Sequence, residues 1–243
     1  MGAIFRKEIS SFFSSIAGYM AIILFLVANG LFLFVFPDTS LLDYGYASLD
    51  KLFSLAPWIY LLLIPAITMR SFSEEQRTGT LEILGSKPLR YAEIIAGKYL
   101  AALVLIFISL LPTLVYYYTI SRLSNIPGDL DNGGIAGSYI GLFLLGAVFA
   151  AIGSWSSSIS NNPVTAFLVA AFCCFFIYWG FDAISKLPVF LSGADYYIEM
   201  AGIRFHYDSI SRGVVDSRDL IYFFSVILIF LSMTRISLTL KKS

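Results

Sequence analysis

Charged side chains are missing from five long stretches of this 243-residue chain, and these gaps constrain its fold more than any other feature. A helix needs about 20 apolar residues to cross a bilayer. The gap at residues 132–181 is 50 residues long, which is too long for one crossing, and the polar stretch Trp155–Pro163 predicts a tight turn inside it. We therefore expect six membrane-spanning helices, near residues 16–36, 53–69, 98–118, 136–155, 164–181 and 220–239.

The composition excludes several other classes of protein. Hydrophobic residues make up 58% of the chain and charged residues 13%, whereas about a quarter of a typical soluble domain is charged. A disordered chain and a typical soluble enzyme are both excluded on this ground. The two cysteines, Cys173 and Cys174, are adjacent within an apolar run, which indicates neither a disulfide framework nor a zinc site. Six spans use about half of the chain, so we expect residues 1–243 to form a single transmembrane domain.

Lysine and arginine predict the orientation of these helices. If the N-terminus is cytoplasmic, the cytoplasmic segments carry 10 basic and 5 acidic residues, and the segments on the opposite side carry 6 basic and 11 acidic residues. Cytoplasmic segments of membrane proteins are enriched in basic residues, so both termini are expected in the cytoplasm. The overall net charge of zero gives no indication of a nucleic-acid partner.

The first 15 residues have the pattern of an amphipathic helix. One face would carry apolar residues and the other basic and hydroxyl residues: Ile4, Phe5, Ile9, Phe12 and Phe13 against Arg6, Lys7, Ser10 and Ser14. Such a helix can lie on the surface of the bilayer. The alternative is that residues 1–15 are a simple start of the first span.

Few residues have the pattern of a catalytic or cofactor site. The nearest approach to a phosphate-binding loop is Gly97-Lys98, but Ala92 replaces its first glycine and Tyr99 its Ser/Thr. We therefore expect no bound cofactor, no metal and no enzymatic activity. His206 is the only histidine. An enzyme that modifies lipids with Asp195, His206 and Asp208 remains an alternative.

The charged segment 70–98 has the pattern of a short helix between two spans. Ser71 or Ser73 could cap its start, with Glu74 and Glu75 in its first turn, and Gly85 could end it. From the residues alone, this segment is either a docking surface or a solvated hairpin. In the fourth predicted span, Gly137-x-x-x-Gly141 permits close helix packing, either within the bundle or against a second subunit.

Two motifs resemble those of a known family. The first is Glu75-x-x-x-Gly79-Thr80-Leu81-Glu82, followed by Leu84, Pro88, Glu93 and Gly97-Lys98. The second is Arg212-Gly213-Val214-Val215-Asp216, before the last predicted span. Both resemble ABC-2 type exporter permeases, and the resemblance extends over essentially the whole chain. Within that family, the chain is similar to the gliding-motility permeases of Bacteroidetes, the GldF type.

The resemblance implies an all-α fold with six spans, an N-terminal surface helix and a cytoplasmic coupling helix. It implies a multi-pass protein of the bacterial inner membrane that exports a substrate, in gliding motility or secretion. Its partners would be a second permease subunit, alike or different, membrane lipid, and a cytoplasmic ABC ATPase subunit that binds the ATP. A scaffold that recruits an ATPase without transporting is the alternative.

The resemblance also assigns roles to residues. The coupling helix would run from about Phe72 to Leu84, with polar contacts to the ATPase from Glu74, Glu75, Arg77 and Glu82. Gly79 and Thr80 would permit close approach. The residues themselves already predict an apolar edge of this helix, formed by Leu81 and Leu84. Residues 182–219 would form short helices that close the outer end and contact an extracytoplasmic partner, and they include the outer-loop motif of Arg212, Gly213 and Asp216.

Overall fold

The computed structural model describes residues 1–36, 48–80, 90–123, 130–189 and 193–241. Within these ranges every regular element is helical. In chain order the elements are α1 (Gly2–Ser14), α2 (Ile16–Phe34), α3 (Asp50–Thr68), α4 (Arg70–Arg77), α6 (Tyr91–Leu110), the 3₁₀ turn η2 (Leu111–Thr113), α7 (Leu114–Leu123), α8 (Asn132–Ile159), α9 (Pro163–Phe175), the π-helical turn η3 (Phe176–Gly180), α10 (Phe181–Ser185), α11 (Asp195–Ala201), α12 (Ile203–Ser211) and α13 (Ser217–Leu240).

The expected all-α membrane fold is confirmed. Five helical stretches of the described residues are long and apolar enough to cross a bilayer, namely Asp50–Arg77, Tyr91–Arg122, Asn132–Ile159, Pro163–Ser185 and Ser217–Leu240. A sixth results if α1 and α2, which meet at 63°, are counted as one stretch. This bend makes α1 an element of its own, which favours the amphipathic surface helix over a simple start of the first span.

Helix α8 is the centre of the bundle, and its glycines allow neighbouring helices to approach it closely. A side chain at Gly137 would collide with the backbone carbonyl of Ile210 in α12, and one at Gly153 would collide with Thr68 in α3. Gly141 faces the ring of Tyr207. The small residues of the fourth span therefore serve packing within this chain.

The chain does turn within the predicted stretch Trp155–Pro163, but the preceding helix ends later than the predicted residue 155. Helix α8 continues through Ser156, Ser157 and Ser158 to Ile159, and all three serines are fully buried. Their hydroxyls are accommodated because each donates to a backbone carbonyl: Ser156 to Ala166 in α9, Ser157 to Met69, and Ser158 to Trp155. The chain turns only at residues 160–162, and the side chain of Asn162 caps α9.

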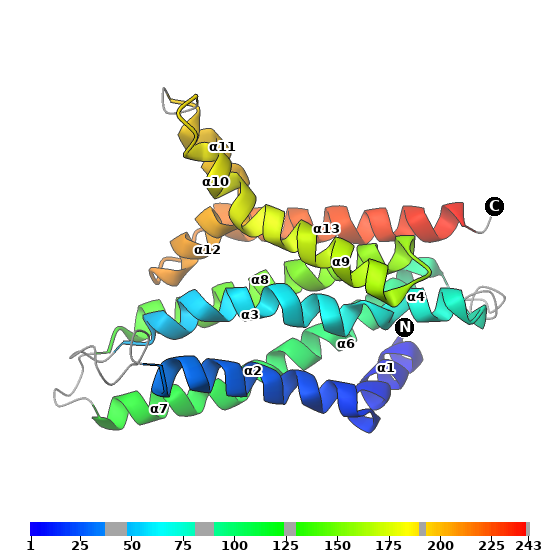
Figure 1. The fold of residues 1–243 in the computed structure, drawn as a ribbon, viewed down its shortest axis with the longest axis horizontal. Helices are drawn as coiled ribbons and strands as arrows, with labels where there is room; N and C mark the ends of the chain where they lie inside the picture. Colours follow the sequence, from blue (N-terminus) through cyan, green and yellow to red (C-terminus); the bar gives the residue numbers. More distant parts are fainter. Residues whose placement is uncertain (37–47, 81–89, 124–129, 190–192, 242–243) are drawn as a thin grey trace.

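Both chain termini lie at the same end of the bundle, together with α4 (Figure 1). The opposite end carries α7 and α12, and α10 and α11 project away from the long helices there. A common end for the two termini is the arrangement that an even number of spans requires. It also brings α1, α4 and the end of α13 into one neighbourhood.

Candidate functional site

Helix α4 is a continuation of α3 beyond Met69. The two form one stretch from Asp50 to Arg77. The prediction that Ser71 or Ser73 caps a separate helix is wrong, since α4 has no side-chain cap at its start and Ser73 Oγ donates instead to the carbonyl of Met69. Glu74 and Glu75 consequently fall beyond the first turn.

A buried serine of α8 holds the start of α4. Ser157 Oγ accepts hydrogen bonds from the backbone N–H groups of Phe72 and Ser73, at 2.9 and 3.0 Å. The same hydroxyl donates to the carbonyl of Met69 at 2.8 Å. Ser157 thus acts as a cap from a helix 84 to 88 residues away in sequence, and it fixes the junction of α3 and α4 to the centre of the bundle.

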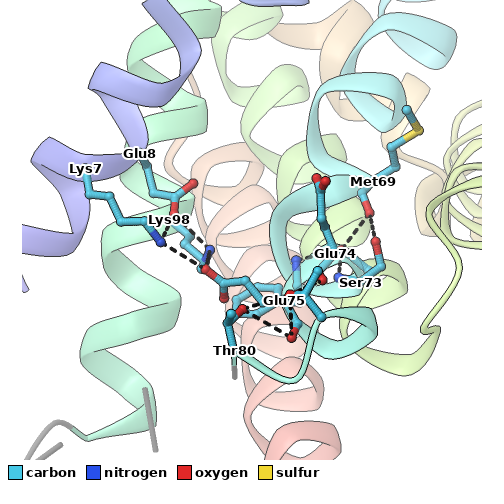
Figure 2. A network of polar contacts seen from close by, with 11 residues as sticks. Lys7, Glu8, Met69, Ser73, Glu74, Glu75, Thr80 and Lys98 are labelled. Atoms are coloured by element: carbon cyan, nitrogen blue, oxygen red, sulfur yellow. Dashed lines mark hydrogen bonds and ion pairs between the residues drawn. The ribbon is translucent and has the colours of Figure 1, made fainter. Parts of the chain in front are cut away.

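Four charged side chains then fix α4 to α1 and α6. Lys98 Nζ of α6 lies 2.9 Å from Glu8 Oε1 of α1 and 2.9 Å from Glu75 Oε1 of α4. Lys7 Nζ approaches the same oxygen of Glu75 at 3.3 Å. Figure 2 shows the four side chains pointing toward one another. The Lys98 side chain is 3% exposed, while Glu75 and Glu8 are 13% and 14% exposed. The group is neutral overall, which makes its burial possible.

Apolar packing surrounds this polar group. The fully buried ring of Phe72 lies 5.3 Å from Lys98 Nζ, within the range of a cation–π contact. Phe72 belongs to a small core that connects α1, α4, α6 and α13, with Ile4, Ile94, Ile95 and Leu238. The low polarity around the ion pairs strengthens the attraction between them.

The side of α4 that faces α13 is also held. Gln76 Nε2 donates to the carbonyl of Ser158 at 2.8 Å, and Gln76 Oε1 accepts from Lys241 Nζ at 2.8 Å. Lys241 also donates to the carbonyl of Ile159 at 3.1 Å. Partial burial lowers the pKa of Lys241. The C-terminal end of α13 is therefore joined to α4 and to the α8–α9 turn.

The predicted coupling residues divide into inward and outward sets. Phe72 and Glu75 face inward, and Glu75 is engaged by Lys98. The expected contact of Glu75 with an ATPase stays a prediction. The more exposed residues define what we call the α4 tip: Glu74, Arg77, Thr78, Gly79 and Thr80. Leu81, Glu82, Leu84 and Gly85 lie outside the described residues.

Within the α4 tip, the helix ends before Gly79. The backbone φ of Gly79 is +70°, a conformation that other residues rarely adopt, and no atom lies within 4 Å of where its side chain would be. Arg77 and Glu74 are 62% and 46% exposed, and their 4.0 Å separation is a weak surface pair. The tip is therefore a polar surface that protrudes from a firmly held helix.

At the other end of the molecule, the outer-loop motif joins α12 to α13. Gly213 has a φ of +83° and lies against the backbone of Gly133 and Gly134, where a side chain would collide. Asp216 caps α13, because its carboxylate accepts from the backbone N–H of Arg218 at 2.9 Å. Arg212 is exposed. The motif's glycine and aspartate thus shape a turn between two helices.

Comparison with known families decides the identity of the chain. The family model described as ABC-2 family transporter protein matches residues 4–240. The chain belongs to the ABC-2 transporter family. The comparison with curated proteins gives no match, so the family model alone carries this assignment. This ABC-2 transporter chain is accordingly a multi-pass membrane protein.

His206 and Asp208 of the alternative enzymatic site are engaged in separate contacts. Both ring nitrogens of His206 are engaged, with Asp219 Oδ1 at 2.7 Å and with the carbonyl of Met200 at 2.9 Å. The imidazole is buried and stacks on Tyr222. Asp208 pairs with Arg204 instead, at 3.6 Å, and burial raises the pKa of Asp208 in spite of that pairing. His206 therefore has the environment of a packing residue that joins α12 to α13 in this ABC-2 transporter.

Sequence reasoning missed the four-charge group and the His206–Asp219 pair. Lys98 and Glu8 are 90 residues apart, and each lies just outside a charge-free gap. The sequence contains one signal for them, which is that a charged residue flanking a long apolar run must find either water or a partner. It does not say which partner that is.

Proposed function

We propose that this chain is the permease subunit of an ATP-driven exporter and that α4 transmits movement from a cytoplasmic ABC ATPase to the spans. The observation that carries the proposal is the contrast within α4: one side is fixed to α1, α6, α8 and α13, and the tip is polar and exposed. A helix that continues a span directly transmits a push without a loose joint. ATP would then bind to the partner subunit and not to this chain.

The route of the movement follows the contacts. A push on the α4 tip would act on α3 directly, because both belong to one helical stretch. It would act on α8 through Ser157 and on α6 through Lys98. Since α8 packs against most other helices of the bundle, a displacement of α4 would be distributed to the whole domain.

The finer parts of the proposal concern location and partners. We place both termini and α4 in the cytoplasm of a bacterial inner membrane, with a second permease subunit beside this one. The similarity of the sequence motifs to the gliding-motility permeases favours a role in motility or secretion. Residues 182–219, which include α11 and α12, would close the outer end and offer contacts to an extracytoplasmic partner.

Charge reversal at the α4 tip tests the function. We expect Glu74→Arg combined with Arg77→Glu to reduce ATPase co-purification and substrate-stimulated ATP hydrolysis at least about tenfold, the effect of losing one or two charge-assisted contacts. Membrane insertion should be unchanged, because the two side chains are 62% and 46% exposed and neither belongs to the buried four-charge group. The matched control is Arg235→Glu, an exposed charge near the same end of the molecule. Undiminished co-purification and hydrolysis in the tip variant would contradict the proposal.

A further inference from the structure

A cavity of about 570 Å³ lies between α1, α2, α3 and α4, and Lys98 of α6 reaches its wall. This volume is within the range of pockets that hold small ligands. The polar and apolar residues that line the cavity are segregated into two halves. Its polar lining comes mainly from α1 and α4, whereas its apolar lining comes from the adjoining turns of α2 and α3, with Met20, Ala21, Leu24, Leu63, Ala66 and Ile67.

The polar half offers one acceptor without a hydrogen-bond partner and one cation without an acidic partner among the described residues. Glu75 Oε2 is buried and has no hydrogen-bond partner among the described residues, although Oε1 of the same carboxylate binds Lys98 and Lys7. A buried polar atom without a partner is costly. Arg70 is exposed at the same cavity, and its guanidinium pairs with no acidic side chain in the described part of the chain. The cavity thus presents a site for a cation next to a site for an anion.

The total charge of the cavity lining restricts the class of ligand that can bind. Three cationic side chains (Lys7, Arg70, Lys98) face three acidic ones (Glu8, Glu74, Glu75) around the cavity. An anionic ligand would therefore add an uncompensated charge to a partly buried site, and so would a cationic one. A zwitterion with an N–H donor close to a phosphate has no net charge, as the neutral lining requires. Its donor matches Glu75 Oε2 and its phosphate matches Arg70.

The apolar half requires that this zwitterion carry a hydrocarbon chain. The side chains of Met20 and Leu24 are more than half exposed, and they belong to a helix at the position of the first predicted span. A chain that leaves the cavity along α2 would therefore continue into the bilayer. The change from polar to apolar lining occurs where α1 meets α2 and α4 meets α3, as expected at a membrane interface.

We propose that this cavity binds one aminophospholipid with a phosphoethanolamine headgroup. Its ammonium donates to Glu75 Oε2, its phosphate accepts from Arg70 and Lys7, and an acyl chain lies against Leu24, Leu63 and Ile67. The bound lipid would fill the space between α1 and α4. This inference stands without the proposed transport function, because it concerns binding to the chain alone.

The test uses the full-length chain in nanodiscs that contain equal amounts of dioleoyl phosphatidylethanolamine, phosphatidylcholine and phosphatidylglycerol. After release into detergent, native mass spectrometry counts the lipids retained per chain. We expect one phosphatidylethanolamine, retained about tenfold over phosphatidylcholine, whose quaternary ammonium cannot donate the hydrogen bond to Glu75. Equal retention of the two lipids, or preferred retention of phosphatidylglycerol, would overturn the proposal.

Two variants with matched controls locate the site. Ala66→Trp should fill the apolar half and abolish the preference, while Leu62→Trp, at an exposed position one turn away that does not line the cavity, should keep it. Arg70→Gln should reduce retention about tenfold, while Arg77→Gln should not. If Ala66→Trp and Leu62→Trp behave alike, the lipid binds elsewhere.

Soluble glycerophosphoethanolamine should compete poorly with the phospholipid for the cavity. Equal competition would show that the apolar half contributes nothing to binding.

Discussion

The ammonium group of Lys98 is held between two carboxylates where α1, α4 and α6 meet. Taking a charge out of water costs several kcal/mol, so a buried ion pair need not add net stability. Removing one partner from such a group is different, because the remaining charges stay buried without compensation. The folded state therefore requires Lys98 as long as Glu8 and Glu75 are present. This holds whether or not the four-charge group as a whole adds to the free energy of folding.

We predict that Lys98→Met destabilises the folded protein by about 3–5 kcal/mol, the cost of breaking a buried ion pair. Adding Glu75→Gln to this variant should recover part of the loss, since one uncompensated carboxylate is then removed. The measurement is the midpoint of unfolding in a sodium dodecyl sulfate titration. Lys7→Met is the control, because Lys7 is 62% exposed and surface pairs contribute about 0–1 kcal/mol. Equal effects of Lys98→Met and Lys7→Met would contradict the assigned burial.

Among the elements, α4 shows how far local sequence determines a helix and its ends. A helix was expected in the charged segment 70–98, and α4 occupies its first eight residues. Its start could not be predicted, because the cap comes from Ser157 of α8 and not from Ser71 or Ser73. The end of α8 was predicted too early for the same reason. Ser156 and Ser157 are buried within the helix because they bond to carbonyl groups outside it, those of Ala166 and Met69.

Hydrogen exchange can detect the cap supplied by Ser157. In Ser157→Ala the N–H groups of Phe72 and Ser73 lose their acceptor, so we expect exchange in peptides covering the start of α4 to become about tenfold faster, as the loss of one hydrogen bond predicts. Ser154→Ala is the matched control, because Ser154 is buried in the same helix and bonds only to Ala150 within it. Unchanged exchange at α4 in Ser157→Ala would show that the cap is not needed.

At the scale of the whole molecule, the sequence predicted most of the fold, because spans are specified locally. A run such as 99–121 must be helical in a bilayer, whatever its neighbours are. Tertiary contacts between spans carry no comparable local signal. The meeting of Glu8 with Lys98 and of His206 with Asp219 depends on how the helices pack, and so do the cavity and the exposure of the α4 tip.

Burial differs strongly among the spans. The most apolar window of α8 is 72% buried, whereas those of the α9–α10 stretch and α13 are only 22% and 17% buried. Exposed apolar residues on α9 and α13 include Phe172, Leu168, Leu228 and Ile236. In a bilayer these side chains face acyl chains or other membrane helices without cost. The molecule is therefore arranged as a packed centre around α8 with an apolar periphery.

The orientation of this arrangement can be tested with single cysteines in a chain that carries Cys173→Ala and Cys174→Ala. Thr80→Cys lies in the α4 tip, Thr239→Cys near the end of α13, and Ser217→Cys at its start, and all three positions are exposed. Because the segments predicted to be cytoplasmic, which include both termini and α4, carry 10 of the 16 basic residues, a membrane-impermeant maleimide should label only Ser217→Cys in intact cells. The other two should react only after the membrane is opened. Labelling of Thr80→Cys and Thr239→Cys from outside would reverse the orientation and remove α4 from the reach of a cytoplasmic ATPase.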